Sequence, residues 1–132
     1  MAESVDIFGT VFKNGSATLL ARIVGLDGAA IVPADIRMIT YSIYLLDDQD
    51  PDARAVVTGH ANVALRVADV IYATLQADAI WTADTLGYNF RHVIDVSSHQ
   101  AFAIAGKKHL VEYELKPAVG QIILVRFRLN VI

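Results

Sequence analysis

The feature that most constrains the fold is a pair of long alternating stretches at the end of the sequence. Apolar side chains recur at every second position from 108 to 116, and the same pattern runs from 121 to 132. The residues between them, Pro-Ala-Val-Gly at 117–120, are of types that form tight turns. Alternation with a period of two over this length is typical of half-buried antiparallel strands. We therefore expect a terminal β-hairpin that closes a β-sandwich or a β-barrel.

The rest of the chain extends this pattern into a complete β-fold. Further strands are predicted at 17–26, 36–46, 55–58, 62–67 and 88–96, with turn signals at intervals of about 8–12 residues. This layout indicates an all-β protein, an Ig-like antiparallel β-sandwich of about seven strands.

Two segments fit this fold less clearly. Residues 68–79 fit either a helical stripe or an interrupted alternation, and we expect one short helical segment near 68–77. Residues 1–16 are predicted to be an N-terminal lead-in or arm, which precedes a single domain at 17–132.

Length, charge and cysteine content exclude several classes of protein. A chain of 132 residues without cysteine is expected to form one domain with its own core, and it has no disulfide or thiolate metal site. The net charge of −3 argues against nucleic-acid binding through phosphate neutralisation. The N-terminus resembles neither a signal peptide nor a membrane span, so we expect synthesis in the host cytoplasm and no membrane partner.

The apolar content points to a covered surface. Hydrophobic residues make up 55% of the chain and charged residues only 19%, against about 25% charged in ordinary soluble domains. We favour the interpretation that another subunit covers part of this apolar surface. The alternative is that alanine, which is at ease on surfaces, inflates the count. The candidate interface residues are Ile7, Phe8, Phe12, Met38, Tyr44, Ile122, Leu124, Arg126 and Arg128.

The candidate metal sites do not meet the requirements of known sites. The acidic loop at 47–52 could offer carboxylates to calcium, but it lacks the central glycine and closing glutamate of an EF-hand. A solvated loop is the favoured interpretation. The histidines at 60, 92, 99 and 109 have no zinc-site spacing. We expect no metal and no cofactor.

The candidate catalytic groups are equally weak. Ser97, Ser98 and His99 are adjacent in sequence, which does not build a triad, and no nucleophile elbow is present. Glu112 and Glu114 resemble a glycosidase pair, but they alternate with apolar residues as a solvent-facing row would. We expect these two glutamates to pair across the hairpin with arginines of the last strand. The alternative is that these charges form a docking surface for a partner subunit. The chain is predicted not to be an enzyme.

The most individual residues lie around the single tryptophan. Trp81 is expected to be a core plug between the sheets or an interface residue. The alternative is a ligand platform for a sugar, which would combine Trp81 with Tyr88, Asn89 and Arg91. That platform requires exposed aromatic rings with polar neighbours.

Two quoted stretches resemble a known group of proteins. LQADAIWTADTLGYNFRHVID is followed by HLVEYELKPAVGQIILVRFRLNVI, so that a GYNF turn precedes the terminal hairpin. Together, residues 65–132 resemble small uncharacterised Ig-like proteins found in phage and prophage-like genomic contexts. The resemblance implies a structural role in the virion, as head decoration or cement, or as a neck or tail accessory.

These observations lead to one expected function and one rival. We expect a non-enzymatic structural subunit of a symmetric assembly, most plausibly a phage virion, whose partners are copies of itself and other virion proteins. The rival is an Ig-like binding module that recognises carbohydrate or a host surface protein through its end loops.

Overall fold

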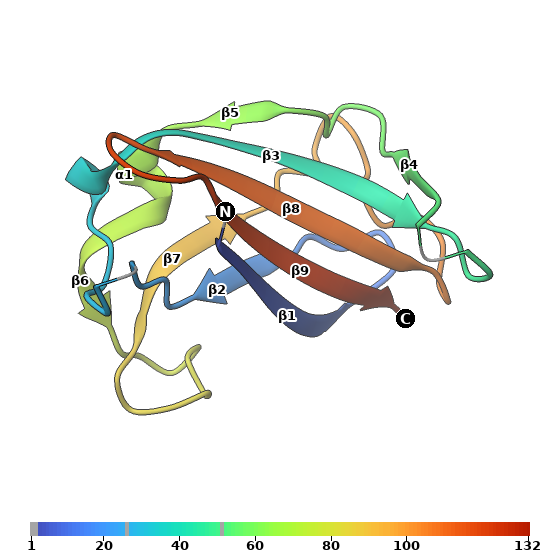
Figure 1. The fold of residues 1–132 in the computed structure, drawn as a ribbon. Helices are drawn as coiled ribbons and strands as arrows, with labels where there is room; N and C mark the ends of the chain where they lie inside the picture. The colour runs from blue at the N-terminus through green and yellow to red at the C-terminus, as the bar shows by residue number, and fades with distance from the viewer. Residues whose placement is uncertain (1–2, 26, 51) are drawn as a thin grey trace.

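The computed structural model describes residues 3–25, 27–50 and 52–132 as a sandwich of two β-sheets (Figure 1). The larger sheet has the order β1 (Glu3–Val11), β9 (Ile123–Val131), β8 (Lys108–Pro117), β3 (Ile36–Leu46) and β4 (Arg54–Val56), with β5 (Val63–Leu65) also paired to β3. The smaller sheet has the order β2 (Thr18–Ala21), β7 (Tyr88–Val93) and β6 (Ile71–Gln76). Short helical turns form η1 (Pro33–Asp35) and α1 (Val67–Val70). The predicted all-β sandwich with a short helical segment is confirmed.

The order of the strands is that of an Ig-like sandwich. Such folds place strands B, E and D in one sheet and strands C, F and G in the other. Here β2, β7 and β6 take the places of B, E and D, while β3, β8 and β9 take those of C, F and G. All the pairs of named strands are antiparallel except β1 with β9, which is parallel. The described residues form nine strands, two more than the predicted seven, because β1 forms within the predicted lead-in and β6 within the predicted helical segment.

The terminal hairpin forms as predicted, and its alternation separates a buried row from an outer row. β8 and β9 pair antiparallel, and Glu112 lies opposite Arg126 in the outer row. Gly120 in the turn has φ +109°, a left-handed conformation that glycine adopts without steric cost. β9 is not an edge strand, because β1 lies along its other side. The buried row of β9 is Ile123, Val125, Phe127, Leu129 and Val131.

The core lies between the two sheets, and its centre is aromatic. Phe90 of β7, Tyr113 of β8 and Phe127 of β9 are all buried. The Phe90 ring lies edge-on to Tyr113 with the centroids 4.8 Å apart, and it stacks with Phe127 at 6.1 Å. Aromatic rings attract one another in both of these arrangements. Aliphatic side chains from both sheets surround the rings, among them Leu19, Ile23, Ile39, Ile43, Ile71, Val111, Leu115 and Val125.

The segment predicted as a lead-in or arm over residues 1–16 instead contributes a strand to the domain. Residues 3–11 form β1, which pairs with β9 along its whole length, from Glu3 opposite Ile123 to Val11 opposite Val131. Gly9 interrupts the apolar alternation of this strand, and a Cβ there would lie 3.2 Å from the Leu129 side chain. β1 cannot be predicted from the local sequence pattern, because this glycine interrupts the alternation and the partner strand is distant in the sequence.

The helix predicted at 68–77 is a single turn, α1, and the chain then continues as a strand. Ile71 pairs with Phe90, and Gln76 pairs with Tyr88. Residues 71–76 contain β-branched and aromatic side chains, which favour a strand over a helix. Pairing with β7 therefore prevails over the helical stripe.

The strand predicted at 17–26 is also shorter than expected. β2 ends at Ala21, and only an isolated bridge joins Val24 to Ala30 beyond it. The end of that prediction, Leu26, lies outside the described residues. The chain leaves the strand early because the Asn89 side chain, in place of a neighbouring strand, bonds to the backbone N–H and C=O of Ile23.

Candidate interaction site on the open side of the sandwich

The candidate site is a groove of about 470 Å³ on the side of the sandwich where β1 and β2 form the edges of their sheets. Residues 7–12 and 16–20 form its two walls, and the loop residues 80–83 close one flank. We call this region the edge groove. Phe127 and Leu129 of the core row also line it, so the groove reaches toward the hydrophobic core.

The β1 wall of the edge groove is a long edge strand. Among the described residues, β1 pairs only with β9, so its other edge has no strand partner. Proteins usually protect edge strands with proline, lysine, a bulge or a short length. β1 is nine residues long, contains no proline, lysine or arginine, and keeps one register with β9 throughout. The other edge strands, β2, β4, β5 and β6, have only three to six residues each.

Large apolar side chains are exposed along the edge groove. Phe8 is 76% exposed, Phe12 is 73% exposed and Ile80 is 53% exposed, and all three line the groove. Trp81 joins them with a half-buried ring. Apolar surface gathered in one place marks an interaction site more often than scattered exposed residues do, and aromatic side chains are the usual anchors of interfaces.

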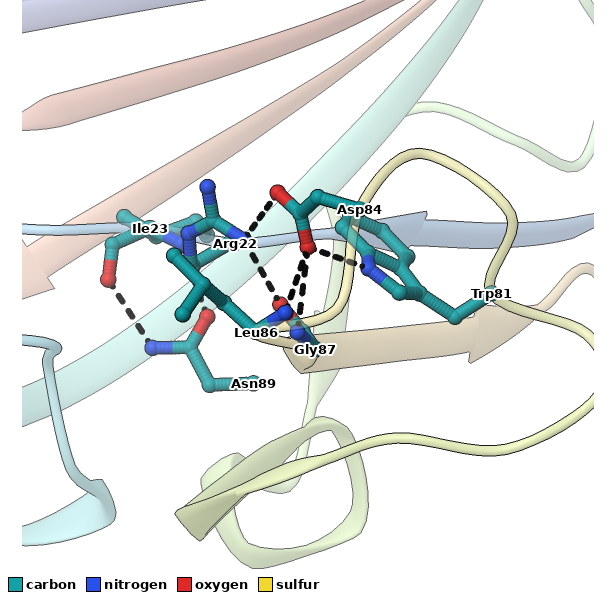
Figure 2. Close-up of polar contacts among 7 residues, drawn as sticks. All are labelled: Arg22, Ile23, Trp81, Asp84, Leu86, Gly87 and Asn89. Atoms are coloured by element: carbon teal, nitrogen blue, oxygen red, sulfur yellow. Dashed lines mark hydrogen bonds and ion pairs between the residues drawn. The ribbon is translucent and has the colours of Figure 1, made fainter.

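A single carboxylate, Asp84, fixes the position of Trp81 (Figure 2). The indole Nε1–H donates to Asp84 Oδ1 at 2.8 Å, and the Arg22 guanidinium pairs with Oδ2 from the opposite side. The backbone N–H groups of Leu86 and Gly87 also donate to Oδ1. These hydrogen bonds, that of the indole first and that of Arg22 second, hold the pKa of the Asp84 carboxyl well below its usual range. The indole is therefore a positioned wall of the groove rather than a mobile side chain.

Two residues of the predicted ligand platform lie behind this wall, inside the domain. Tyr88 is 3% exposed, and its hydroxyl donates to Asp78 at 2.8 Å. Asn89 is 1% exposed; its carbonyl accepts from the Ile23 N–H, and its amide donates to the carbonyls of Ile23 and Ile31. These two residues lack the exposure that the ligand-platform alternative requires, and Asn89 is buried because it replaces strand pairing for the segment that follows β2.

The other two platform residues, Trp81 and Arg91, are half-buried. Trp81 is not the core plug between the sheets, since Phe90 fills that place and the indole lies at the rim, 5.7 Å from the Tyr88 ring. Arg91 is half-buried on β7 opposite Leu20, and its Nε is buried without a hydrogen-bond partner among the described residues. Only Trp81 of the four lines the edge groove.

The predicted interface residues fall into two groups. The outer face of the larger sheet brings together Phe8, Met38, Tyr44, Leu124, Arg126 and Arg128. The remaining three are not among the paired positions of that face. Ile7 packs against the core, Phe12 follows β1 at the groove, and Ile122 precedes β9.

Charges on the outer face are largely matched within the chain. Arg126 Nε donates to Glu112 at 2.9 Å, as the cross-strand alternative expects. Arg54 lies 4.0 Å from the same carboxylate, and its guanidinium lies 4.1 Å from the centre of the Tyr44 ring. This pattern is typical of a solvated face, so the edge groove is the more apolar of the two surfaces.

The acidic loop at 47–52 uses its carboxylates internally. Asp47 Oδ1 accepts from the backbone N–H groups of Gln49 and Asp50, and these two bonds lower the pKa of Asp47. Asp48 pairs with Lys107 at 3.2 Å. The described part of the chain contains no cluster of three metal-ligating side chains. Pro51 lies outside the described residues.

Two histidines, His60 and His92, bond to tyrosine hydroxyls or to backbone rather than to a nucleophile. His60 bonds to the Tyr41 hydroxyl at 3.0 Å and to the His99 carbonyl at 2.7 Å. His92 Nδ1 lies 2.6 Å from the Tyr113 hydroxyl, and burial lowers the pKa of His92 to about 4. Burial also raises the pKa of Tyr113 well above its usual value. The neutral forms of His92 and Tyr113 are therefore favoured, as suits a hydrogen-bonded part of the core.

The remaining candidate groups do not form a catalytic arrangement: the Nδ1 of His109 is buried without a hydrogen-bond partner among the described residues. The Ser97 hydroxyl donates to Asp95 at 2.6 Å and not to the neighbouring His99. His109, the fourth histidine, is buried beside the ring of Phe102, and its burial lowers its pKa. These side chains do not converge on one cavity.

Comparison with known proteins adds no assignment. No protein-family model, no curated protein and no solved structure matches this chain. Across the described residues, no helix has the length and apolar character needed to cross a membrane.

Proposed function

We propose that the protein is a non-enzymatic structural subunit of a symmetric assembly, and that copies of the chain associate through the edge groove. The observation that carries this proposal is the coincidence of two features in one place. The long edge strand β1 has an edge without a strand partner among the described residues, and Phe8, Phe12 and Ile80 are exposed beside it.

Each feature favours association for a separate physical reason. An unprotected edge offers backbone donors and acceptors to another strand, and exposed aromatic rings gain free energy when a partner removes them from water. Both features are present on every copy of the chain, so a closed symmetric contact can satisfy both at once. Many repeated contacts of this kind hold a large particle together by avidity.

The setting of this assembly is proposed from the resemblance of residues 65–132 to Ig-like phage proteins. In a virion, other structural proteins would be further partners, and the subunit would have no cofactor, nucleic-acid or membrane role. Identification of the virion proteins that co-purify with the chain would assign its position in the particle, as decoration, neck or tail accessory.

The mass of the purified protein in solution tests the proposal. We expect light scattering to give more than 14.4 kDa, the mass of one chain. The variants Phe12→Ser and Ile80→Ser should lower this mass at equal concentration. Val119→Ser is the matched control, because Val119 is 91% exposed at the opposite end of the larger sheet from Phe12. A strict monomer at the highest soluble concentration would refute the proposal.

A second candidate function rests on one cavity. A pocket of about 450 Å³ lies between the segment 25–36 and the β8–β9 turn, the end at which Ig-like domains carry binding loops. Its floor is formed by Ile31, Ile36 and Ile123, and none of the described residues that line it is aromatic. An apolar floor suits a protein segment better than a sugar.

Binding at this pocket would identify the protein as a recognition module. Glycan arrays and panels of host surface proteins are the assays, and Val119→Asp is the variant that places a charge at the pocket rim. A ligand that the wild type binds and this variant does not would favour the second function over the first.

A further inference from the structure

We infer that two copies of the chain pair through their β1 strands, antiparallel about a two-fold axis, so that the larger sheets become one continuous sheet. This inference rests on the proposed function and names the contact within it. Its partner is a second copy of the same chain, and the bonds that define it belong to the backbone.

The first argument concerns the hydrogen bonds of the β1 backbone. In a strand, successive N–H and C=O groups point to alternate sides, so pairing with β9 uses only part of them. No other backbone hydrogen bond of the described residues involves positions 3–10. The groups on the other edge therefore have room for one more strand, and nine residues in one register form an uninterrupted template.

The second argument concerns which strand fits. A two-fold axis pairs a strand with its own copy, and the pairing is then antiparallel. β2, β4, β5 and β6 have three to six residues each, so none offers an equally long match. The only charged residues of β1 are Glu3 and Asp6, and neither would lie opposite its own copy in a pair centred near the middle of the strand, so like charges do not oppose each other there.

The third argument fixes the register. If the axis is perpendicular to the sheet, residues on the same face lie opposite each other. Ile7 packs against the core of its own chain, whereas Phe8 lies on the outer face opposite Arg128 and is 76% exposed. An axis that passes by Phe8 brings the two phenyl rings together as a cross-strand pair. This register covers residues 5–11 of both copies.

The same contact closes the edge groove. The grooves of the two copies face each other across the axis, since each lies directly beside its β1 strand. Ile80 and Trp81 of both copies then become part of one buried apolar region. The bond from the indole to Asp84 holds Trp81 in place before association, so little side-chain freedom is lost on binding.

Disulfide trapping tests the pairing, because the natural chain contains no cysteine. The variant Phe8→Cys places the two thiols opposite each other at the axis, within the Cα separation of about 4.4–6.8 Å that a disulfide requires. Thr10→Cys is the matched control. It is exposed on the same face of the same strand, yet its copies would lie about 13 Å apart along the strands.

We expect Phe8→Cys to form a covalent dimer under mild oxidation, and Thr10→Cys to remain almost entirely uncrosslinked. Equal cross-linking of both variants indicates random collision and overturns the pairing, as does cross-linking of Thr10→Cys alone. If the wild type is oligomeric but Phe8→Cys does not cross-link, the inference fails while the proposed function stands. If the wild type is a strict monomer, both fail together.

Discussion

Asn89 provides the sharpest test of how the loop behind the candidate site is held. Its side chain is buried and makes three hydrogen bonds to the backbone, with the N–H of Ile23 and the carbonyls of Ile23 and Ile31. The perturbation is Asn89→Ala, which removes all three bonds without adding a charge.

The expected loss can be worked out from the partners that remain. The Ile23 carbonyl keeps a bond from the Ile31 N–H at 3.1 Å, so it stays satisfied. The Ile23 N–H and the Ile31 carbonyl lose the bonds from Asn89, and both residues are buried. Each orphaned buried group costs about 1–3 kcal/mol, so the free energy of unfolding should fall by about 2–6 kcal/mol.

Urea denaturation followed by circular dichroism measures this change, provided the slope of the transition is unaltered. Asn130→Ala is the matched control, since Asn130 is exposed on β9, and it should change the stability by less than about 0.5 kcal/mol. A loss below about 1 kcal/mol for Asn89→Ala would refute the conclusion that the three Asn89 hydrogen bonds hold this loop.

The isosteric variant Asn89→Asp adds a pH signature to the same test. Its carboxylate would face two carbonyl oxygens, so burial should raise its folded pKa above the unfolded value of about 3.9. The folded state then binds the proton more tightly, and the deficit relative to the wild type should grow as the pH rises from 4 to 7. Asn89→Ala should show no such growth.

Three further outcomes are expected. Gly59→Ala should destabilise more than Gly106→Ala: both positions have φ near +85°, but a Cβ at Gly59 would lie 2.2 Å from the His99 ring, whereas none of the described atoms lies within 4 Å at Gly106; thermal unfolding compares them. Asp84→Asn should shift tryptophan fluorescence to the red. The stability difference between this variant and the wild type should have its full size above pH 4 and vanish as the pH falls through the depressed folded pKa of Asp84. NMR titration should place the pKa of His92 near 4. Since the unfolded chain binds the proton more readily, stability should decline as the pH falls from about 6.5 toward 4, and His92→Gln should reduce this decline, leaving the part that the lowered pKa of His109 contributes.

Strands with long uninterrupted alternation could be predicted from the sequence. β3 begins and ends at Ile36 and Leu46 as the pattern predicts, and the ends of the two hairpin strands differ from the prediction by at most two residues. In these elements one face is buried along the whole length, so the hydrophobic pattern records the pairing directly.

The strands that could not be predicted from the sequence, β1 and β6, depend on pairing with other strands. Nothing local marks β1 as a sheet strand, because Gly9 breaks its pattern and its partner is the last strand of the chain. β6 forms because β7 lies beside it, against a competing helical periodicity. Sheet propensity of this kind reflects neighbours more than the segment itself.

The candidate site could be predicted only in part. Phe8, Phe12 and Trp81 were singled out from residue type, and the edge groove brings these three together. Their common location follows from which strands end up at sheet edges, and local pattern does not contain that information. The burial of Tyr88 and Asn89 likewise depends on the path of the chain after β2.

The parallel pairing of β1 with β9 sets the order in which the molecule can be completed (Figure 1). The larger sheet needs residues from both extremes of the chain, and such distant contacts carry a high entropic cost of closure. Synthesis therefore leaves β1 without its partner until residues 123–131 emerge, and folding should be slow for a domain of this size. During that interval the same exposed strand is open to other newly made copies, so assembly and misassembly would begin from one element.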